Sequence, residues 1–386
     1  MFGLRPRRIY LDYASATPPL KEAIAAMRNA ESLVGNPGAI HAEAVAAKKA
    51  LEHARAEIAS ELACKARELI FTSGLTESND LAILGVARKL EYADRMKDSH
   101  WIVSAIEHDA VLQSFAEIER LGGEVTHVRP NEKGIISAES IVQAVRPETV
   151  LTSIGWANNE IGVVQPLREI CRAVLKKNPN ILIHSDAGQA PLYISPHVHT
   201  LGVDLLSLGS NKLYGPHGIG ALYISNRVNA ASILFGGKQE RGLRPGTENV
   251  ALAVGFAAAV KAISQMRESE KRRLRKLRDA LAGELSTHIP GSIINGETDR
   301  ALPHMLNVSI PNIQSEYVTL FLDKRGISVS TKSACREGEE SRSHVVAALS
   351  SEDWRAENSL RISMGKDTSS RDISRIVAAL EESVRR

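Results

Sequence analysis

Short apolar runs alternate with longer helical patterns between about residues 69 and 225. The runs are rich in aliphatic and β-branched residues, and turn residues follow most of them, which is typical of βαβ units around a mostly parallel sheet. We predict strands at residues 69–72, 101–105, 150–154, 181–185, 205–208 and 220–224. The pattern therefore predicts an α/β fold.

A long amphipathic pattern follows at about residues 249–285, where leucines recur at helical spacing. Beyond Pro290 and Gly291 the apolar runs become shorter, and we predict strands at residues 305–310, 327–330 and 359–363 before a closing helix. A change of this kind indicates a second, smaller α+β domain.

The composition excludes several classes of protein. The chain has 386 residues, of which 43% are hydrophobic, and its net charge is only +3, so neither disorder nor electrostatic binding of nucleic acid is expected. The longest charge-free apolar stretch, residues 250–260, is too short for a membrane span, which needs about 20 residues. The N-terminus has no apolar segment of the kind that secretion signals carry, and the three cysteines show no CxxC spacing. We expect a cytoplasmic enzyme with no membrane segment and no metal site.

Polar residues follow one predicted strand after another. The strand at residues 69–72 is followed by Gly74 and Thr76 at the start of a helix, where free backbone N–H groups and a hydroxyl could bind a phosphate. His108, Asn159 and Gln189 follow three later strands. Each of these residues also has an ordinary interpretation as a turn or cap, but the carboxyl ends of parallel strands meet at one edge, where ligands bind.

Asp186 and Lys212 give this edge a specific chemistry. Asp186 ends a buried apolar strand, so its carboxylate needs a cationic partner or several hydrogen bonds to stay charged. Lys212 lies 26 residues further on, directly after the next strand. A lysine that forms a Schiff base and a carboxylate that meets a ring nitrogen are the pair that pyridoxal 5'-phosphate (PLP) requires.

The sequence resembles the cysteine desulfurases, which are class V members of the fold type I PLP-dependent enzymes. The resemblance covers nearly the whole chain and rests on the segments at residues 10–18, 35–37, 71–78, 107–108, 158–162, 186–189, 212–216, 244–249, 333–335 and 361–365. It implies a fold type I architecture with a large cofactor-binding domain (residues 18–255). It also implies a small domain made of residues 1–17 and 256–386, which contains a catalytic cysteine loop.

The resemblance also implies roles for the residues around the cofactor. Lys212 would hold PLP covalently, Asp186 would pair with the ring nitrogen, and His108 would stack on the ring and move protons. The ring oxygen would be bound by Asn159 and Gln189. The phosphate would be bound by Gly74 and Thr76 of one subunit and by Thr247 of the other, so a homodimer is implied.

For the substrate, the resemblance implies L-cysteine. Arg361 would bind its carboxylate, and Asn36 and Ala14 would line its pocket. Cys335 would take the sulfur as a persulfide, release L-alanine and deliver the sulfur to an acceptor protein. An iron–sulfur scaffold and a tRNA-thiolation protein are both compatible with this chemistry, and direct contact with nucleic acid is not expected.

Two positions depart from the family pattern beside Lys212. Asn211 stands where the family usually has histidine, and Gly209 replaces a phosphate-binding serine. We expect the hydroxyl of Ser210 to replace the missing one, and we expect weaker retention of PLP than is usual in the family.

Two other functions remain open from the sequence. The chain could be a selenocysteine lyase or a related PLP lyase, for which the Cys335 thiol can be dispensable. It could also be a non-catalytic scaffold that has kept the fold, for which Gly209 and Asn211 are the only indications.

Overall fold

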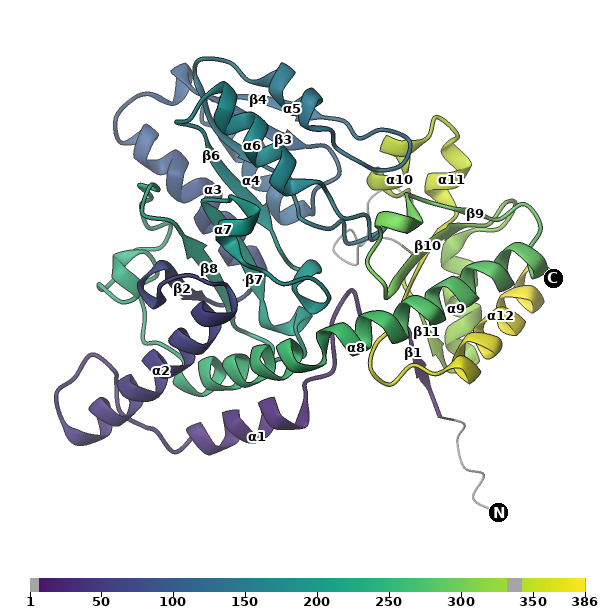
Figure 1. The fold of residues 1–386 in the computed structure, drawn as a ribbon, viewed down its shortest axis with the longest axis horizontal. Helices are drawn as coiled ribbons and strands as arrows, with labels where there is room; N and C mark the ends of the chain where they lie inside the picture. Colours follow the sequence, from purple (N-terminus) through teal and green to yellow (C-terminus); the bar gives the residue numbers. More distant parts are fainter. Residues whose placement is uncertain (1–6, 332–341, 386) are drawn as a thin grey trace.

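The computed structural model describes residues 7–331 and 342–385. Its centre is a seven-stranded sheet in the order β2-β8-β7-β6-β5-β3-β4 (Figure 1). The strands of this sheet are β2 (Leu69–Thr72), β3 (His100–Ser104), β4 (Glu124–Val128), β5 (Thr149–Ser153), β6 (Leu182–Asp186), β7 (Leu205–Gly209) and β8 (Gly220–Ile224). Only β8 runs antiparallel to its neighbours, β2 and β7. The prediction of an α/β fold with a mostly parallel sheet is confirmed.

Both faces of this sheet are buried because the strands are apolar on both sides. Successive residues of a strand point to opposite faces. Ile70 and Leu205 belong to one apolar cluster, whereas their neighbours Phe71 and Leu206 belong to another. The helices that connect the strands cover the faces: α3 (Leu75–Glu91), α4 (Asp109–Arg120), α5 (Ala138–Ala144), α6 (Leu167–Lys177) and α7 (Val198–Leu201).

A smaller region lies beside the sheet and is built from the last part of the chain together with β1 from its beginning. It has a three-stranded antiparallel sheet, β12-β10-β9, and a two-stranded parallel pair, β1-β11. The strands are β1 (Ile9–Tyr10), β9 (Ile293–Ile294), β10 (Met305–Ser309), β11 (Ile327–Ser328) and β12 (Ser359–Ser363). The helices are α9 (Ser315–Lys324), α10 (His344–Leu349), α11 (Asp353–Glu357) and α12 (Ser370–Val384).

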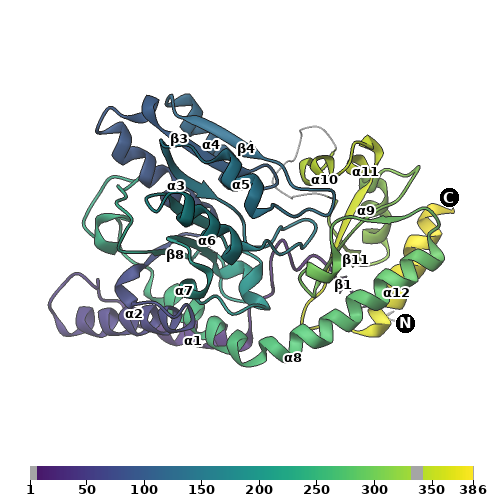
Figure 2. The same cartoon turned by 45° about the horizontal axis from the view of Figure 1, so that its top comes forward.

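One long helix, α8 (Val250–His288), joins the two regions. Figures 1 and 2 show it running from α1 (Lys21–Ala30) and α2 (Ala42–Glu61) to α12. By length and composition α8 could cross a membrane, but half of its most apolar window is buried, as in the core helix of a folded domain. The boundary predicted at residue 255 lies inside this helix.

The predicted strands agree with the structure to within one residue at each end, except that β11 ends at Ser328 rather than at residue 330. The sequence analysis missed the edge strand β4. Its side chains are half-buried or exposed except at Val128, so it lacks the continuous apolar run of the central strands.

Candidate active site

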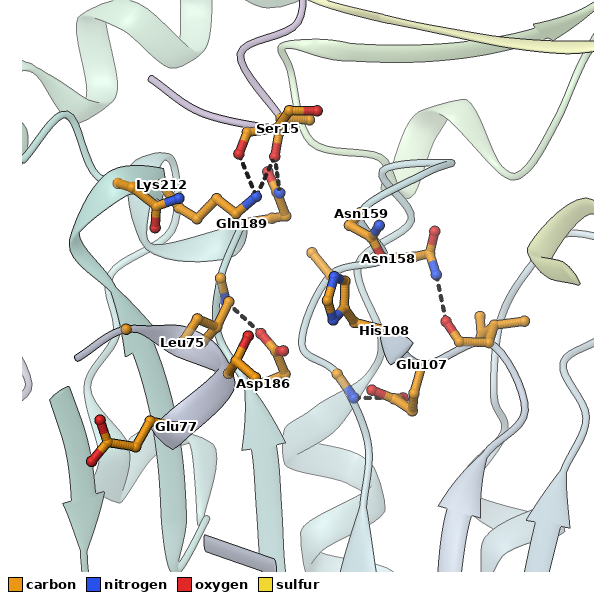
Figure 3. A pocket seen from close by; sticks show the side chains of 18 of the residues that line it. Ser15, Leu75, Glu77, Glu107, His108, Asn158, Asn159, Asp186, Gln189 and Lys212 are labelled. Atoms are coloured by element: carbon orange, nitrogen blue, oxygen red, sulfur yellow. Dashed lines mark hydrogen bonds between the residues drawn. The ribbon is translucent and has the colours of Figure 1, made fainter. Parts of the chain in front are cut away.

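A cavity of about 420 Å³ lies at the carboxyl ends of the parallel strands. Its walls come from the segments that follow β3, β5, β6 and β7, and from the first turn of α3. Ala14 and Arg361 reach it from the smaller region. Figure 3 shows the polar side chains converging there from both regions of the molecule.

Lys212 ends a short 3-10 helix directly after β7. Its Nζ donates hydrogen bonds to the carbonyl oxygens of Ala14, at 2.9 Å, and Ser15, at 2.6 Å. These two oxygens hold the amine at the cavity wall, next to the N-terminal segment (Figure 3). The structure thus gives the cavity a primary amine that is fixed in place.

Asp186 is the last residue of β6 and is 9% exposed. Its carboxylate accepts a hydrogen bond from Asn79 Nδ2, at 2.7 Å, and another from the backbone N–H of Gly188, at 2.8 Å. These bonds supply the partners that a buried carboxylate needs. Asn79 lies on α3, one helical turn after Leu75, and was not among the predicted site residues.

Glu107 and His108 follow β3. His108 caps α4, because its Nδ1 accepts a hydrogen bond from the backbone N–H of Ala110 at 3.1 Å. Glu107 Oε1 accepts one from the backbone N–H of Gly155 at 2.8 Å. Burial raises the pKa of the Glu107 carboxyl to about 8, so this group is mostly protonated at neutral pH. The sequence analysis assigned a role to His108 alone, although Glu107 also lines the cavity.

The two adjacent asparagines after β5, Asn158 and Asn159, have different roles. Asn158 builds the loop, since its side chain donates to the carbonyl of Ile106 and accepts from the backbone N–H groups of Glu160 and Ile161. Asn159 lines the cavity beside His108 (Figure 3). Among the described residues no side-chain hydrogen bond of the Asn159 amide is present, so its expected contact with a ligand stays a prediction.

One end of the cavity is suited to a phosphate. Gly74 precedes α3, and the first backbone N–H groups of this 17-residue helix have no acceptor within the helix. Thr76 lines the same end, together with Ser73 and His217, which the sequence analysis missed. Glu77 would oppose an anion, but it pairs with Arg244 at 3.0 Å. Hydroxyls, amides and an imidazole therefore surround this end.

Arg361 lies on β12 and is 2% exposed. Its guanidinium contacts Asp12 Oδ1 at 2.8 Å, Ser15 Oγ at 2.5 Å and the carbonyl of Asn159 at 2.9 Å. Its Nε has no hydrogen-bond partner among the described residues. A substrate carboxylate at this cation would have to compete with Asp12.

Ala14 and Gln189 also lie at this end of the cavity. Gln189 Nε2 donates to the carbonyl of Ala14 at 2.8 Å, and both residues line the cavity. Arg361, Ala14, Gln189 and Lys212 are therefore within reach of one bound molecule.

Three predicted site residues do not line this cavity. Ser210 is fully buried, and a Cβ on Gly215 would lie only 2.1 Å from its Oγ, so the side chain faces Gly215. The expectation that Ser210 supplies a phosphate hydroxyl is therefore wrong for this structure. Asn36 is exposed between α1 and α2, where its Oδ1 caps a turn by accepting from the backbone N–H of Gly38, so one chain does not bring it to the site.

Thr247 is the third residue outside the cavity. It is exposed and lines a neighbouring hollow, which shares Ser73, Gly218 and Ile219 with the cavity. Cys335 lies outside the described residues. Among those that are described, no cluster of three His, Cys, Asp or Glu side chains is arranged to hold a metal ion.

The residues present fit PLP. The cofactor carries an aldehyde, a basic ring nitrogen, a ring oxygen and a phosphate. The cavity offers Lys212 for the first, Asp186 for the second, Asn159 for the third and the start of α3 for the fourth.

The chain is similar to known proteins over nearly all of its length. The family model "Aminotransferase class-V" matches residues 9–376. The cysteine desulfurase IscS of Dictyoglomus turgidum is 38% identical over 376 residues, which are 97% of this chain and 94% of that protein. The cysteine desulfurase IscS of Methanosarcina thermophila is also 38% identical, over 98% of this chain and 93% of that protein.

Solved structures of other proteins are also similar to this chain. A "NifS-like protein" superposes with a TM-score of 0.91 at 31% identity and covers 98% of this chain and 99% of its own. A structure described as "SspA in complex with cysteine" has a TM-score of 0.80 at 34% identity, covering 92% of this chain and 98% of its own. The chain belongs to the class-V aminotransferase family. It is a fold type I enzyme that depends on PLP.

Proposed function

We propose that this enzyme is a cysteine desulfurase, which converts L-cysteine to L-alanine and transfers the sulfur to Cys335 as a persulfide. The observation that supports this most strongly is the meeting of Lys212, Asp186 and Arg361 in one cavity. The relatives named cysteine desulfurase and the neighbour in complex with cysteine support the same substrate.

Arg361 is proposed to bind the substrate carboxylate. A guanidinium offers two parallel donors to a carboxylate, and this one is held in place by Asp12, Ser15 and the carbonyl of Asn159. Because Arg361 is buried, the interaction is little weakened by solvent. The incoming carboxylate would take over part of the contact that Asp12 now makes.

Lys212 is proposed to hold PLP and then to move protons at the substrate Cα. When bound, PLP supplies an electron-accepting ring that stabilises negative charge at that carbon. Asp186 would keep the ring nitrogen protonated, because its carboxylate is fixed by Asn79 and Gly188 and lines the cavity. His108 lies beside the same space and is the second candidate for proton transfer.

Cys335 is proposed as the sulfur acceptor within the enzyme. Its thiolate attacks the sulfur of cysteine, the bond between that sulfur and the substrate Cβ breaks with its electron pair going to the carbon, and Cβ gains a proton to give alanine. The described residues on either side of residues 332–341 adjoin the cavity walls. Ser330 pairs with Arg361 through both backbone groups, and Ser343 Oγ donates to Glu160.

We also propose a homodimer. The support is the position of Thr247, which is exposed beside the phosphate end of its own cavity, together with exposed apolar side chains such as Ile40 (96%) and Phe235 (83%). Light scattering of the PLP-loaded enzyme should give a dimer mass, and a monomer mass would contradict this proposal.

The acceptor that takes the sulfur from Cys335 is proposed to be a protein.

The test of the proposed function is alanine release by the PLP-loaded enzyme. With L-cysteine, the wild type should release alanine, whereas Cys335→Ala should release little. Equal alanine release by Cys335→Ala would indicate a lyase that does not store sulfur, and L-selenocysteine should then be the better substrate. Bound PLP with no alanine from either substrate would contradict the proposal.

A further inference from the structure

Two glycines at the strand ends that form the cavity have no conformational reason to be glycine. Gly209 has φ −124° and ψ 124°, which any residue in a strand adopts. Gly188, two residues after β6, is also outside the left-handed region. The reason for these glycines must therefore be the space around them.

The side chain nearest to both positions is Leu75, and Asp186 Oδ1 and Asn211 Oδ1 follow at 3.1 Å from a Cβ on Gly188 and on Gly209 respectively. A Cβ on Gly188 would lie 2.6 Å from Leu75 Cδ2, and a Cβ on Gly209 would lie 2.9 Å from Leu75 Cβ. Both distances are shorter than real Cβ contacts, because packed carbon atoms stay about 3.5–4 Å apart. Leu75 therefore lies against both strand ends: its Cδ2 faces Gly188, and its Cβ, which any residue except glycine would carry, faces Gly209.

Leu75 lies at the start of a helix and is partly exposed in the cavity. It is the first residue of α3, is only half-buried, and lines the cavity next to Ser73, Thr76 and Asp186. Figure 3 shows Leu75 and His108 on either side of Asp186. Covering an apolar group that is exposed in the cavity with an apolar ligand surface lowers the free energy of the complex.

We propose that Leu75 is a positioning residue for the cofactor: its side chain packs against the PLP ring beside Asp186, on the side away from His108. This inference rests on the proposed binding of PLP at Lys212. Gly188 is then a glycine because the Leu75 side chain occupies the space of its Cβ, whereas Gly209 leaves room for the first residue of α3 whatever its side chain.

The test is a double-mutant cycle with PLP titration as its readout. Leu75→Ala should raise the PLP dissociation constant about five- to tenfold and change the visible circular dichroism of bound PLP. The substitution removes the apolar contact with the ring, which would bury roughly half of the leucine side chain. Leu84→Ala is the matched control, since Leu84 is a half-buried leucine of the same helix that packs on the core outside the cavity. It should lower the melting temperature of the cofactor-free protein but leave the affinity and the dichroism unchanged.

The second arm places a methyl group where Leu75 now lies. Gly188→Ala should weaken PLP binding when residue 75 is Leu, and the loss should be at least about fivefold smaller in the double variant Leu75→Ala/Gly188→Ala, because the 2.6 Å contact is then absent. Equal losses in both backgrounds, or wild-type affinity and dichroism in Leu75→Ala, would overturn the inference. No spectral change when PLP is added to the wild type would overturn the proposed function, and the inference with it.

Discussion

Replacement of Asp186 by Asn separates the chemistry of this carboxylate from its structural role. Asp186 accepts from Asn79 Nδ2 and from the Gly188 N–H. In Asp186→Asn one of these acceptor positions becomes an NH₂ group. The Oδ1 atom of Asn79 is buried without a hydrogen-bond partner among the described residues. A flip of the Asn79 amide therefore turns this oxygen toward the new NH₂ group and supplies its acceptor. The variant should therefore fold with nearly the stability of the wild type.

Its activity should fall sharply, because a neutral amide cannot keep the ring nitrogen protonated. A hydrogen bond to a charged group is worth about 1.5–3 kcal/mol, which corresponds to a loss of roughly 10- to 150-fold in kcat/KM. Asp186→Ala removes both acceptors instead, and leaves two buried donors unpaired at a cost of about 1–3 kcal/mol each. Alanine release and urea unfolding should be measured for both variants. Wild-type activity in Asp186→Asn, or an equal loss of stability in the two variants, would refute this reasoning.

Three further changes test the other side chains of the cavity. Lys212→Ala should abolish turnover and covalent PLP; borohydride reduction followed by mass spectrometry should add the cofactor mass to the wild type alone. Arg361→Lys should raise KM for cysteine about tenfold with a smaller change in kcat, because an ammonium cannot bind a carboxylate in bidentate fashion; steady-state kinetics decide, and an unchanged KM would argue against Arg361 as the carboxylate site. The pKa of Glu107 is about 8 in the folded protein and 4.5 in the reference state, so the folded state binds the extra proton and stability falls as pH rises between these values. Relative to Glu107→Gln, the wild type should lose up to about 1.4 kcal/mol per pH unit in urea unfolding, and a pH-independent difference would contradict the raised pKa.

Much of the site could be predicted because its residues follow strands directly. Asp186 and Lys212 each come at the end of an apolar run or just after it, and the carboxyl ends of parallel strands meet at one edge. The hydrogen-bond partners of the site residues could not be found in this way. Asp12, the partner of Arg361, lies 349 residues from it in the sequence. Asn79, the partner of Asp186, belongs to a helix on which nothing local marks it for this contact.

The directions in which side chains point could not be predicted from the sequence either. Ser210 is only two residues from Lys212, yet in the 3-10 helix its hydroxyl faces Gly215 rather than the cavity. Gly209 could be recognised as a departure from the family, but its link to Leu75 depends on the approach of α3 to the end of β7. The polar edge strand β4 was missed because it lacks an apolar run.

The most direct test of the proposed function is mass spectrometry of the PLP-loaded enzyme after brief exposure to L-cysteine, with peptide mapping and alanine quantified in the same sample. The account predicts one additional sulfur atom on the peptide that contains Cys335, in proportion to the alanine released in the first turnover. Alanine release while every Cys335 peptide keeps its unmodified mass, under conditions that preserve persulfides, would contradict it.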